Sequence, residues 1–68
     1  MKNQLRVILA IKKISVSEIY ENTGVSKTTI YGLYHEKTKN PSLITVLNIC
    51  DYLGITVDNF IHGLEEVS

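Results

Sequence analysis

The sequence predicts an all-helical fold, a compact bundle of five helices in a single domain over residues 1–68. Three observations support this prediction. Apolar residues recur every three or four positions along most of the chain, which is the spacing of a buried helix face. Polar residues that can cap helices precede these segments, and Gly24, Gly54 and Gly63 follow three of them, where glycine commonly ends a helix. Hydrophobic residues make up 44% of the chain, enough to build a core.

The composition argues against several classes of protein. A single cysteine, Cys50, excludes an internal disulfide and is expected to be a buried apolar residue, and no Cys/His group has metal-site spacing. No apolar run approaches the roughly 20 residues that cross a membrane. The start of the chain lacks the features of a signal peptide, so we expect a cytoplasmic protein. His35 and His62 have no partners that would form a catalytic set, so the sequence predicts neither an enzyme nor a cofactor or metal.

The zero net charge hides a division between two parts of the chain. Residues 1–40 hold seven basic and three acidic residues, a net charge of +4. Residues 41–68 hold four acidic residues and no basic one, a net charge of −4. This division predicts one surface that can face phosphates and another that cannot. The basic residues are Lys2, Arg6, Lys12, Lys13, Lys27, Lys37 and Lys39.

The first two helices are predicted from their caps and their apolar spacing. The first covers Asn3–Lys13. Ser15 begins the second through a capping box, in which its hydroxyl accepts from the Glu18 amide while the Glu18 carboxylate accepts from the Ser15 amide. This second helix ends at Gly24. The residues expected to face the core here are Leu5, Ile8, Leu9 and Ile19.

A turn of only four residues, Thr23-Gly24-Val25-Ser26, leads to a third helix over residues 27–34. Ser26 caps this helix, and Ile30 and Leu33 face inward. Helices can cross steeply over so short a turn if one residue takes the left-handed conformation, which glycine adopts without a steric penalty. Val25 can fill the space between the two helices. This is a helix-turn-helix arrangement, in which the second helix can enter the major groove of DNA.

Two further helices follow a polar loop at residues 35–41, where Pro41 prevents a simple continuation. The fourth starts either at Ser42 or at Asn40 with Pro41 in its first turn, and it ends at Gly54. Thr56 caps a short fifth helix, which Gly63 ends. The positions of the fourth helix that follow the helical period, and are therefore expected to face the core, are Leu43, Val46, Leu47, Cys50 and Leu53. The fifth helix contains Val57, Phe60 and Ile61.

Three stretches together resemble a known family: SVSEIYENTGVSKTTIYGL at residues 15–33, KTKNPSL at 37–43 and LGITVDNFI at 53–61. They are similar to the lambdoid phage repressor and Cro family, also called XRE-type helix-turn-helix proteins. The similarity extends from about Leu5 to Ile61. It implies five helices with residues 15–34 as the reading unit, and regulation of transcription by binding to a double-stranded DNA operator.

The resemblance also implies which residues contact DNA. The bases would be read by outward side chains of the third helix, Lys27, Thr28 and Tyr31. The phosphates would be bound by the starts of the second and third helices and by the loop after the third, at Ser17, Ser26, Lys37, Thr38, Lys39 and Asn40. The alternative for Lys27 and Thr28 is an ordinary solvated first turn, and that for Lys37 and Lys39 is a solvated loop. Tyr31 suits packing at the domain surface equally well.

Three positions depart from the family pattern. Val16 stands where a glutamine usually orients against phosphate and neighbouring side chains. Tyr20 replaces a small residue in the middle of the second helix, so we expect different packing there, with Tyr20 in the core or in an interface. Gly32 stands where a long polar reader is common, which removes one base contact and weakens the helix by roughly 1 kcal/mol. The departures change the expected contacts, not the expected fold.

These inferences predict a sequence-specific transcriptional regulator, a repressor or Cro-like protein that binds a palindromic operator as a homodimer. The chain leaves no room for a small-molecule effector domain. The competing function is a protein-interaction module of the same fold, antitoxin-like or anti-repressor, which the zero net charge and the apolar first helix favour. The alternative dimer surface is the Val7 and Ile11 side of the first helix. The preferred dimer contact is the apolar C-terminal region, with Val57, Phe60, Ile61 and Leu64.

Overall fold

Five α-helices carry most of the residues that the structure describes. The computed structural model describes residues 1–64, and this part of the chain contains no strand. The helices are α1 (Leu5–Lys12), α2 (Val16–Thr23), α3 (Lys27–Tyr34), α4 (Leu43–Leu53) and α5 (Val57–His62). Their number and order confirm the predicted all-helical bundle. None of these helices is long and apolar enough to cross a membrane.

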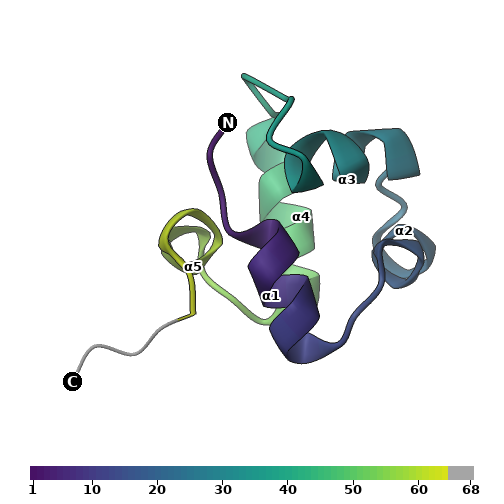
Figure 1. Ribbon diagram of the computed structural model, residues 1–68. Helices are drawn as coiled ribbons and strands as arrows, with labels where there is room; N and C mark the ends of the chain where they lie inside the picture. The colour runs from purple at the N-terminus through teal and green to yellow at the C-terminus, as the bar shows by residue number, and fades with distance from the viewer. Residues whose placement is uncertain (65–68) are drawn as a thin grey trace.

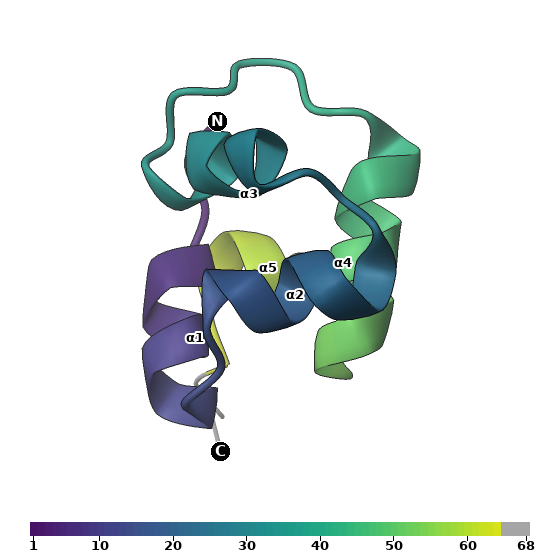
Figure 2. The same cartoon turned by 90° about the vertical axis from the view of Figure 1, so that its right-hand side faces the viewer.

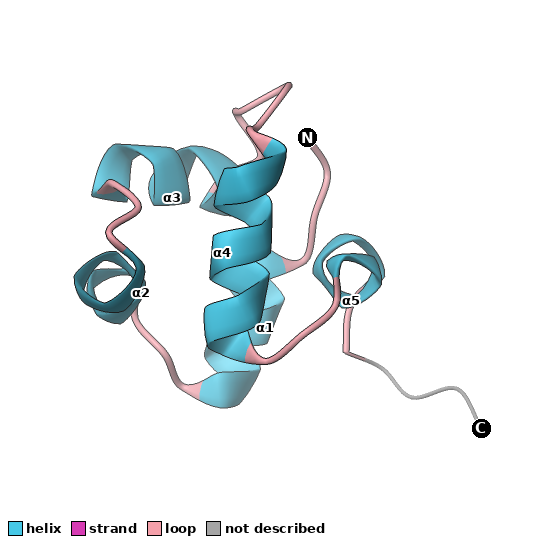
Figure 3. Ribbon diagram, turned by 180° about the vertical axis from the view of Figure 1, so that it is seen from behind, coloured by secondary structure: helices cyan, strands magenta, loops and turns pink. Residues whose placement is uncertain are grey.

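The helices are arranged around α1 and α4. Figure 1 shows α2 and α3 on one side of these two helices and α5 on the other. Seen from behind, α4 lies between the α2–α3 pair and α5 (Figure 3). Helix α2 packs against α3 and α4, and α5 packs against α1 and α4. Helix α3 lies at an edge of the molecule, with the loop after it arching over to α4 (Figure 2).

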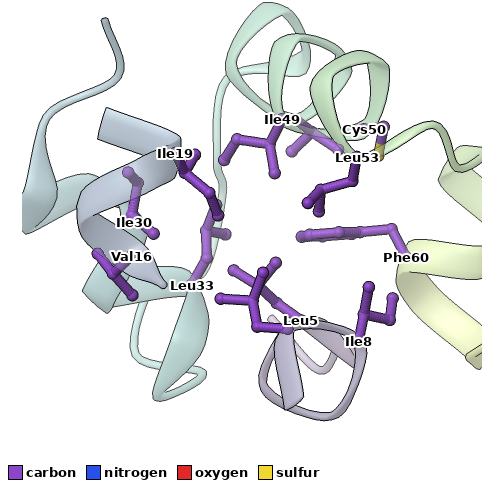
Figure 4. Packing of buried hydrophobic residues seen from close by; sticks show 12 residues of the cluster. Leu5, Ile8, Val16, Ile19, Ile30, Leu33, Ile49, Cys50, Leu53 and Phe60 are labelled. Atoms are coloured by element: carbon purple, nitrogen blue, oxygen red, sulfur yellow. The ribbon is translucent and has the colours of Figure 1, made fainter. Parts of the chain in front are cut away.

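The core brings together side chains from all five helices. Phe60 points from α5 into the middle of the bundle, towards Leu5 of α1 and Leu53 of α4 (Figure 4). Burial of one such large apolar side chain contributes about 1.5–3 kcal/mol relative to leaving it exposed. The fully buried side chains are Leu5, Ile8, Ile19, Ile30, Leu33, Ile49 and Phe60. The predicted core positions of the first three helices are confirmed.

The start of α1 is held by Asn3, a buried polar residue that is only 5% exposed. Its side-chain oxygen accepts from the Leu5 amide at 2.9 Å, so the helix begins two residues later than predicted. The Asn3 amide nitrogen donates to the Leu33 carbonyl at 2.9 Å and to the Met1 carbonyl at 3.0 Å. Asn3 therefore ties the N-terminal segment to the end of α3.

The predicted caps of the later helices are also found. Ser15 and Glu18 form the capping box of α2, and Thr56 and Asn59 form a second one at the start of α5. Ser42, rather than Asn40, occupies the N-cap position of α4, although its side chain makes no cap hydrogen bond. The side chains at the starts of α2 and α5 therefore cap these helices as the sequence predicts, whereas that of Ser42 does not.

The core-facing side of α4 differs from the predicted one. The expectation that Leu43 and Leu47 face the core is wrong, because their side chains are 66% and 46% exposed. Ile49 is fully buried instead, beside the correctly predicted Cys50. Helix α4 has more apolar residues than its neighbours can cover, so periodicity alone does not identify the centre of the buried side.

The apolar residues of α5 and the segment after it divide between the core and the surface. Phe60 is 0% exposed, so it closes the core of the protomer and offers no surface to a second copy; its predicted place in a dimer contact is corrected. Val57 is exposed, and Ile61 and Leu64 are half-buried.

Candidate nucleic-acid interface

The turn between α2 and α3 has the geometry that a helix-turn-helix requires. Gly24 has a φ of 79°, in the left-handed region, and its amide donates to the Tyr20 carbonyl at 3.0 Å. Thr23 supports the turn through its hydroxyl, which donates to the Ile19 carbonyl at 2.7 Å and accepts from the Val25 amide at 3.1 Å. Val25 packs half-buried against the core. Both turn predictions, a left-handed glycine and an apolar plug, are confirmed.

The start of α3 is capped by a small hydroxyl network. The Ser26 hydroxyl accepts from the Thr29 amide at 3.2 Å and lies 2.9 Å from the Thr29 hydroxyl. This cap satisfies the third amide of the helix and leaves the amides of Lys27 and Thr28 without an intrahelical partner. Free amides and the positive end of the helix dipole favour an anion at this position.

The three predicted base-reading residues lie on the exposed side of α3. Lys27, Thr28 and Tyr31 are all exposed, and Tyr31 retains 46% of its accessible surface. Tyr31 stacks on His35, with ring centroids 6.0 Å apart and planes 14° apart. The Tyr34 ring is in T-shaped contact with both, with its centroid 6.1 Å from that of Tyr31 and 5.0 Å from that of His35. The outer side of α3 therefore starts with a lysine and ends with an aromatic cluster.

The loop after α3 folds back on the end of that helix. The Gly32 carbonyl accepts from the amides of Lys37 and Thr38 at 2.8 and 3.2 Å, and the Met1 amino group donates to the Thr38 carbonyl. Lys37, Lys39 and Asn40 are exposed, as phosphate contacts require, whereas Thr38 is half-buried. The loop thus presents two lysines from an anchored backbone.

Gly32 lies against this loop. A Cβ atom at this position would collide with the Thr38 hydroxyl oxygen. The sequence did not predict this contact, and the expected loss of one base contact at position 32 stays a prediction. The glycine permits the close approach of Thr38 to α3.

Val16 and Tyr20 show how α2 differs from the family pattern. Val16 is only 7% exposed and belongs to the core, so its side chain does not reach towards a phosphate. The core alternative for Tyr20 is wrong, because its side chain is 45% exposed. The Lys27 ammonium lies over the Tyr20 ring, 5.5 Å from the ring centroid. Tyr20 thus contacts the first residue of α3.

The first turn of α2 exposes Ser17, the remaining predicted phosphate residue. A hollow of about 410 Å³ lies beside this turn, between α1, the start of α2 and the end of α3. Arg6 and His35 line it together with Tyr31. Neither Arg6 nor His35 was predicted as a site residue. Arg6 reaches the reading helix only through the packing of α1 against α3, and His35, the C-cap residue of α3, was considered only as a catalytic or metal-binding residue.

The described residues also bear on metal binding and on the single thiol. No three His, Cys, Asp or Glu side chains among residues 1–64 are grouped so that they could hold a metal ion. Cys50 is 3% exposed, and burial raises the pKa of its thiol by desolvation. Cys50 is therefore a neutral core residue, as predicted.

A capped helix held at the edge of a small bundle by a glycine turn defines the class of helix-turn-helix DNA-binding domains. The chain belongs to the Cro/C1-type helix-turn-helix DNA-binding family, whose model matches residues 4–62. A search among curated proteins returns no match. The family match confirms the resemblance seen in the sequence and makes double-stranded DNA the partner of the domain.

Proposed function

We propose that the protein is a sequence-specific transcriptional regulator, a repressor or Cro-like protein that binds a palindromic operator as a homodimer. The observation that carries the proposal is the exposed first turn of α3. Lys27 and Thr28 project from it, beside two helix amides that lack an intrahelical partner. This turn would enter the major groove of bound DNA, where the two side chains would contact the edges of bases. Occupation of an operator that overlaps a promoter would then repress transcription.

The proposed contacts with DNA are of two kinds, contacts with bases and contacts with phosphates. Lys27, Thr28 and Tyr31 lie on one exposed side of α3 and read bases. Lys37 and Lys39 lie on the anchored loop at the other end of α3 and neutralise phosphates. Ser17, Ser26, Thr38 and Asn40 complete the phosphate contacts. Because Thr38 is half-buried, only its exposed atoms can contact a phosphate; otherwise it supports the loop backbone.

Dimerisation follows from the small size of the reading surface. A single module of this kind buries roughly 600–1,000 Å² on DNA, which seldom suffices to distinguish an operator from competing genomic sites. Two copies on successive turns of the groove, about 34 Å apart, would double the number of bases read. The operator would then be palindromic, because the dimer has two-fold symmetry.

The structure offers two exposed apolar regions for the second copy. Val57 and Ile61 line a hollow of about 290 Å³ between α4, α5 and the loop, together with Leu43. Leu64 lies elsewhere, with Val7 and Ile11 in a hollow of about 400 Å³ beside α1. We place the dimer contact at the first region, which we call the α4–α5 face and define by Leu43, Val57 and Ile61. Lys39 and Asn40 line the same hollow, so a contact there would keep both phosphate-binding loops next to the dimer axis.

Selection of bound sequences from a random pool of double-stranded DNA tests the proposed function. We expect enrichment of a palindrome with half-sites about one helical turn apart. The logarithm of the binding constant should fall linearly with the logarithm of salt concentration, because each neutralised phosphate releases counterions. Failure to enrich any sequence would contradict the proposal.

The second candidate function is a protein-interaction module, favoured by the apolar side chains on the surface. Ile11, Leu43 and Ile44 are 60%, 66% and 70% exposed. Large apolar side chains that share an exposed patch mark sites of protein interaction. Salt distinguishes the two functions, because binding through an apolar protein interface responds weakly to ionic strength. Salt-insensitive binding to a protein, with no preference among DNA sequences, would identify the interaction module.

A further inference from the structure

The contact between Tyr20 and Lys27 joins the two helices of the reading unit at the point where bases are proposed to be read. The Lys27 ammonium lies 5.5 Å from the centroid of the Tyr20 ring, within the range of a cation–π interaction. Within residues 1–64, Lys27 forms no ion pair with a carboxylate. The ring of Tyr20 is therefore in a position to attract this charge.

Val16, at the position where the family pattern has a glutamine, does not supply a side chain for this purpose. Val16, at the first position of the helix, is apolar and 7% exposed. Tyr20 lies one helical turn later, and its exposed ring extends to the first residue of α3. Val16, at the position that would orient a neighbouring base-reading side chain, is thus part of the core. The aromatic ring of Tyr20 lies nearby and contacts Lys27 instead.

We propose that Tyr20 is a positioning residue that determines specificity: its ring holds the Lys27 ammonium in the direction from which it reads a base pair. This inference rests on the proposed function. A lysine side chain has a flexible four-carbon stem, and its ammonium is a point charge without the fixed geometry of an arginine. A free lysine therefore contacts phosphates and several base edges with similar ease. If the ring restricts the Lys27 side chain before DNA binds, the ammonium reaches one base acceptor more readily than others, and the side chain loses less conformational entropy on binding.

The geometry can be tested first in the free protein by NMR. Protons held over the face of an aromatic ring resonate upfield, so the ε-methylene protons of Lys27 should be shifted relative to those of Lys39. Tyr20→Phe keeps the ring and should keep the shift, whereas Tyr20→Leu should abolish it. Identical Lys27 shifts in the wild type and in Tyr20→Leu would show that the ammonium does not rest on the ring, and would overturn the inference.

Specificity is tested on the selected operator and on the same operator changed at the base pair that depends on Lys27. Tyr20→Leu should lower the ratio of the two affinities by about two- to fivefold, the effect of an exposed cation–π contact, while Tyr20→Phe should preserve it. In a double-mutant cycle, Tyr20→Leu should change nothing further once Lys27→Met has removed the charge. Tyr52→Leu is the matched control, because Tyr52 lies on α4 and its hydroxyl accepts from Asn22.

The outcomes separate this inference from the proposed function. A wild-type protein without sequence preference would overturn both. A wild-type protein with a clear preference, together with an unchanged ratio in Tyr20→Leu, would overturn the role of Tyr20 alone. A ratio that falls equally in Tyr20→Leu and Tyr52→Leu, in step with the melting temperature, would show a structural effect and would also overturn it.

Discussion

Gly32 and Thr38 lie in direct contact, and this contact anchors the loop that carries Lys37 and Lys39. The Gly32 carbonyl accepts from the Thr38 amide at 3.2 Å, and the side-chain direction of Gly32 is filled by the Thr38 hydroxyl. Gly32 therefore links α3, which is proposed to contact bases, to the loop that is proposed to contact phosphates. The coupling has consequences that can be measured.

Gly32→Ala should stabilise the protein less than its helical position suggests. Alanine gains about 1 kcal/mol over glycine in a helix interior, but its Cβ forces the Thr38 hydroxyl to turn away, and an unfavourable rotamer costs about 0.5–1.5 kcal/mol. In a Thr38→Ala background the clash is absent, so Gly32→Ala should give its full gain. Chemical denaturation of the four variants measures the difference. Equal effects in the two backgrounds would show that Thr38 does not constrain position 32.

Gly24→Val should destabilise the domain by more than about 1 kcal/mol, because a β-branched residue is strained at positive φ. The φ of Gly24 is 79°, and no atom beyond its own chain neighbours lies within 4 Å of the position its Cβ would take, so the backbone causes the cost. Gly24→Asn is the control, because asparagine tolerates the left-handed region better. Thermal melting should rank the wild type above Gly24→Asn and Gly24→Asn above Gly24→Val. An unchanged melt for Gly24→Val would contradict the turn geometry.

Lys12 and Lys13 should respond to glycine with opposite signs. Lys13 ends α1 with a φ of 58°, so Lys13→Gly should relieve strain and stabilise by about 0.5–1 kcal/mol after the added freedom of the unfolded chain is counted. Lys12 is helical, so Lys12→Gly should destabilise by about 0.5–1 kcal/mol. Both changes remove one positive charge, which makes each the control for the other. Denaturation midpoints that move in the same direction would rule out strain at Lys13.

The sequence predicts the features that depend on neighbouring residues. The caps at Ser15, Ser26 and Thr56 need only a side chain and the amide three residues later, and each was found where the pattern placed it. Gly24 likewise can adopt a positive φ without a steric penalty in any surroundings, because it has no Cβ atom. Local chemistry of this kind explains why the order of the helices and the turn of the reading unit could be predicted.

The features that the sequence did not predict depend on packing between distant segments. Ile49 rather than Leu47 faces the core because of where α2 and α5 lie against α4, and the periodicity of α4 suits either residue. Contact of Gly32 with Thr38 and of Tyr20 with Lys27 likewise requires the final positions of a loop and of two helices. The proposed contacts of Lys27, Thr28 and Tyr31 with bases stay predictions, although all three side chains are exposed.

Lys27→Ala and Lys39→Ala should weaken DNA binding in different ways. Lys27→Ala should cost about 1–3 kcal/mol on the selected operator and relax the preference at one base pair of each half-site. Lys39→Ala should weaken binding to all sequences alike and lower the salt dependence by about one phosphate contact. Binding titrations at several salt concentrations, on the operator and on a scrambled duplex, separate the two effects. An unchanged sequence preference in Lys27→Ala would place the reading surface elsewhere.

A single charge on the α4–α5 face should dissociate the proposed dimer. Leu43 is 66% exposed and lines the same hollow as Val57 and Ile61. Leu43→Asp should give a monomer at concentrations where the wild type sediments as a dimer, because the desolvation of a carboxylate in this contact outweighs its attraction to Lys39, which lines the same hollow. Ile44→Asp is the matched control. Ile44 is the next residue, is 70% exposed and lies outside that hollow, so this variant should remain dimeric.

Operator binding provides the second measurement of the dimer contact. Leu43→Asp should bind the palindrome no more tightly than an isolated half-site, yet keep the same base preference within that half-site, because α3 is untouched. Ile44→Asp should bind the palindrome as the wild type does. A monomeric wild type that binds half-sites and palindromes equally well would contradict the dimer. Dissociation by Leu64→Asp but not by Leu43→Asp would move the contact to the hollow that Leu64 shares with Val7 and Ile11.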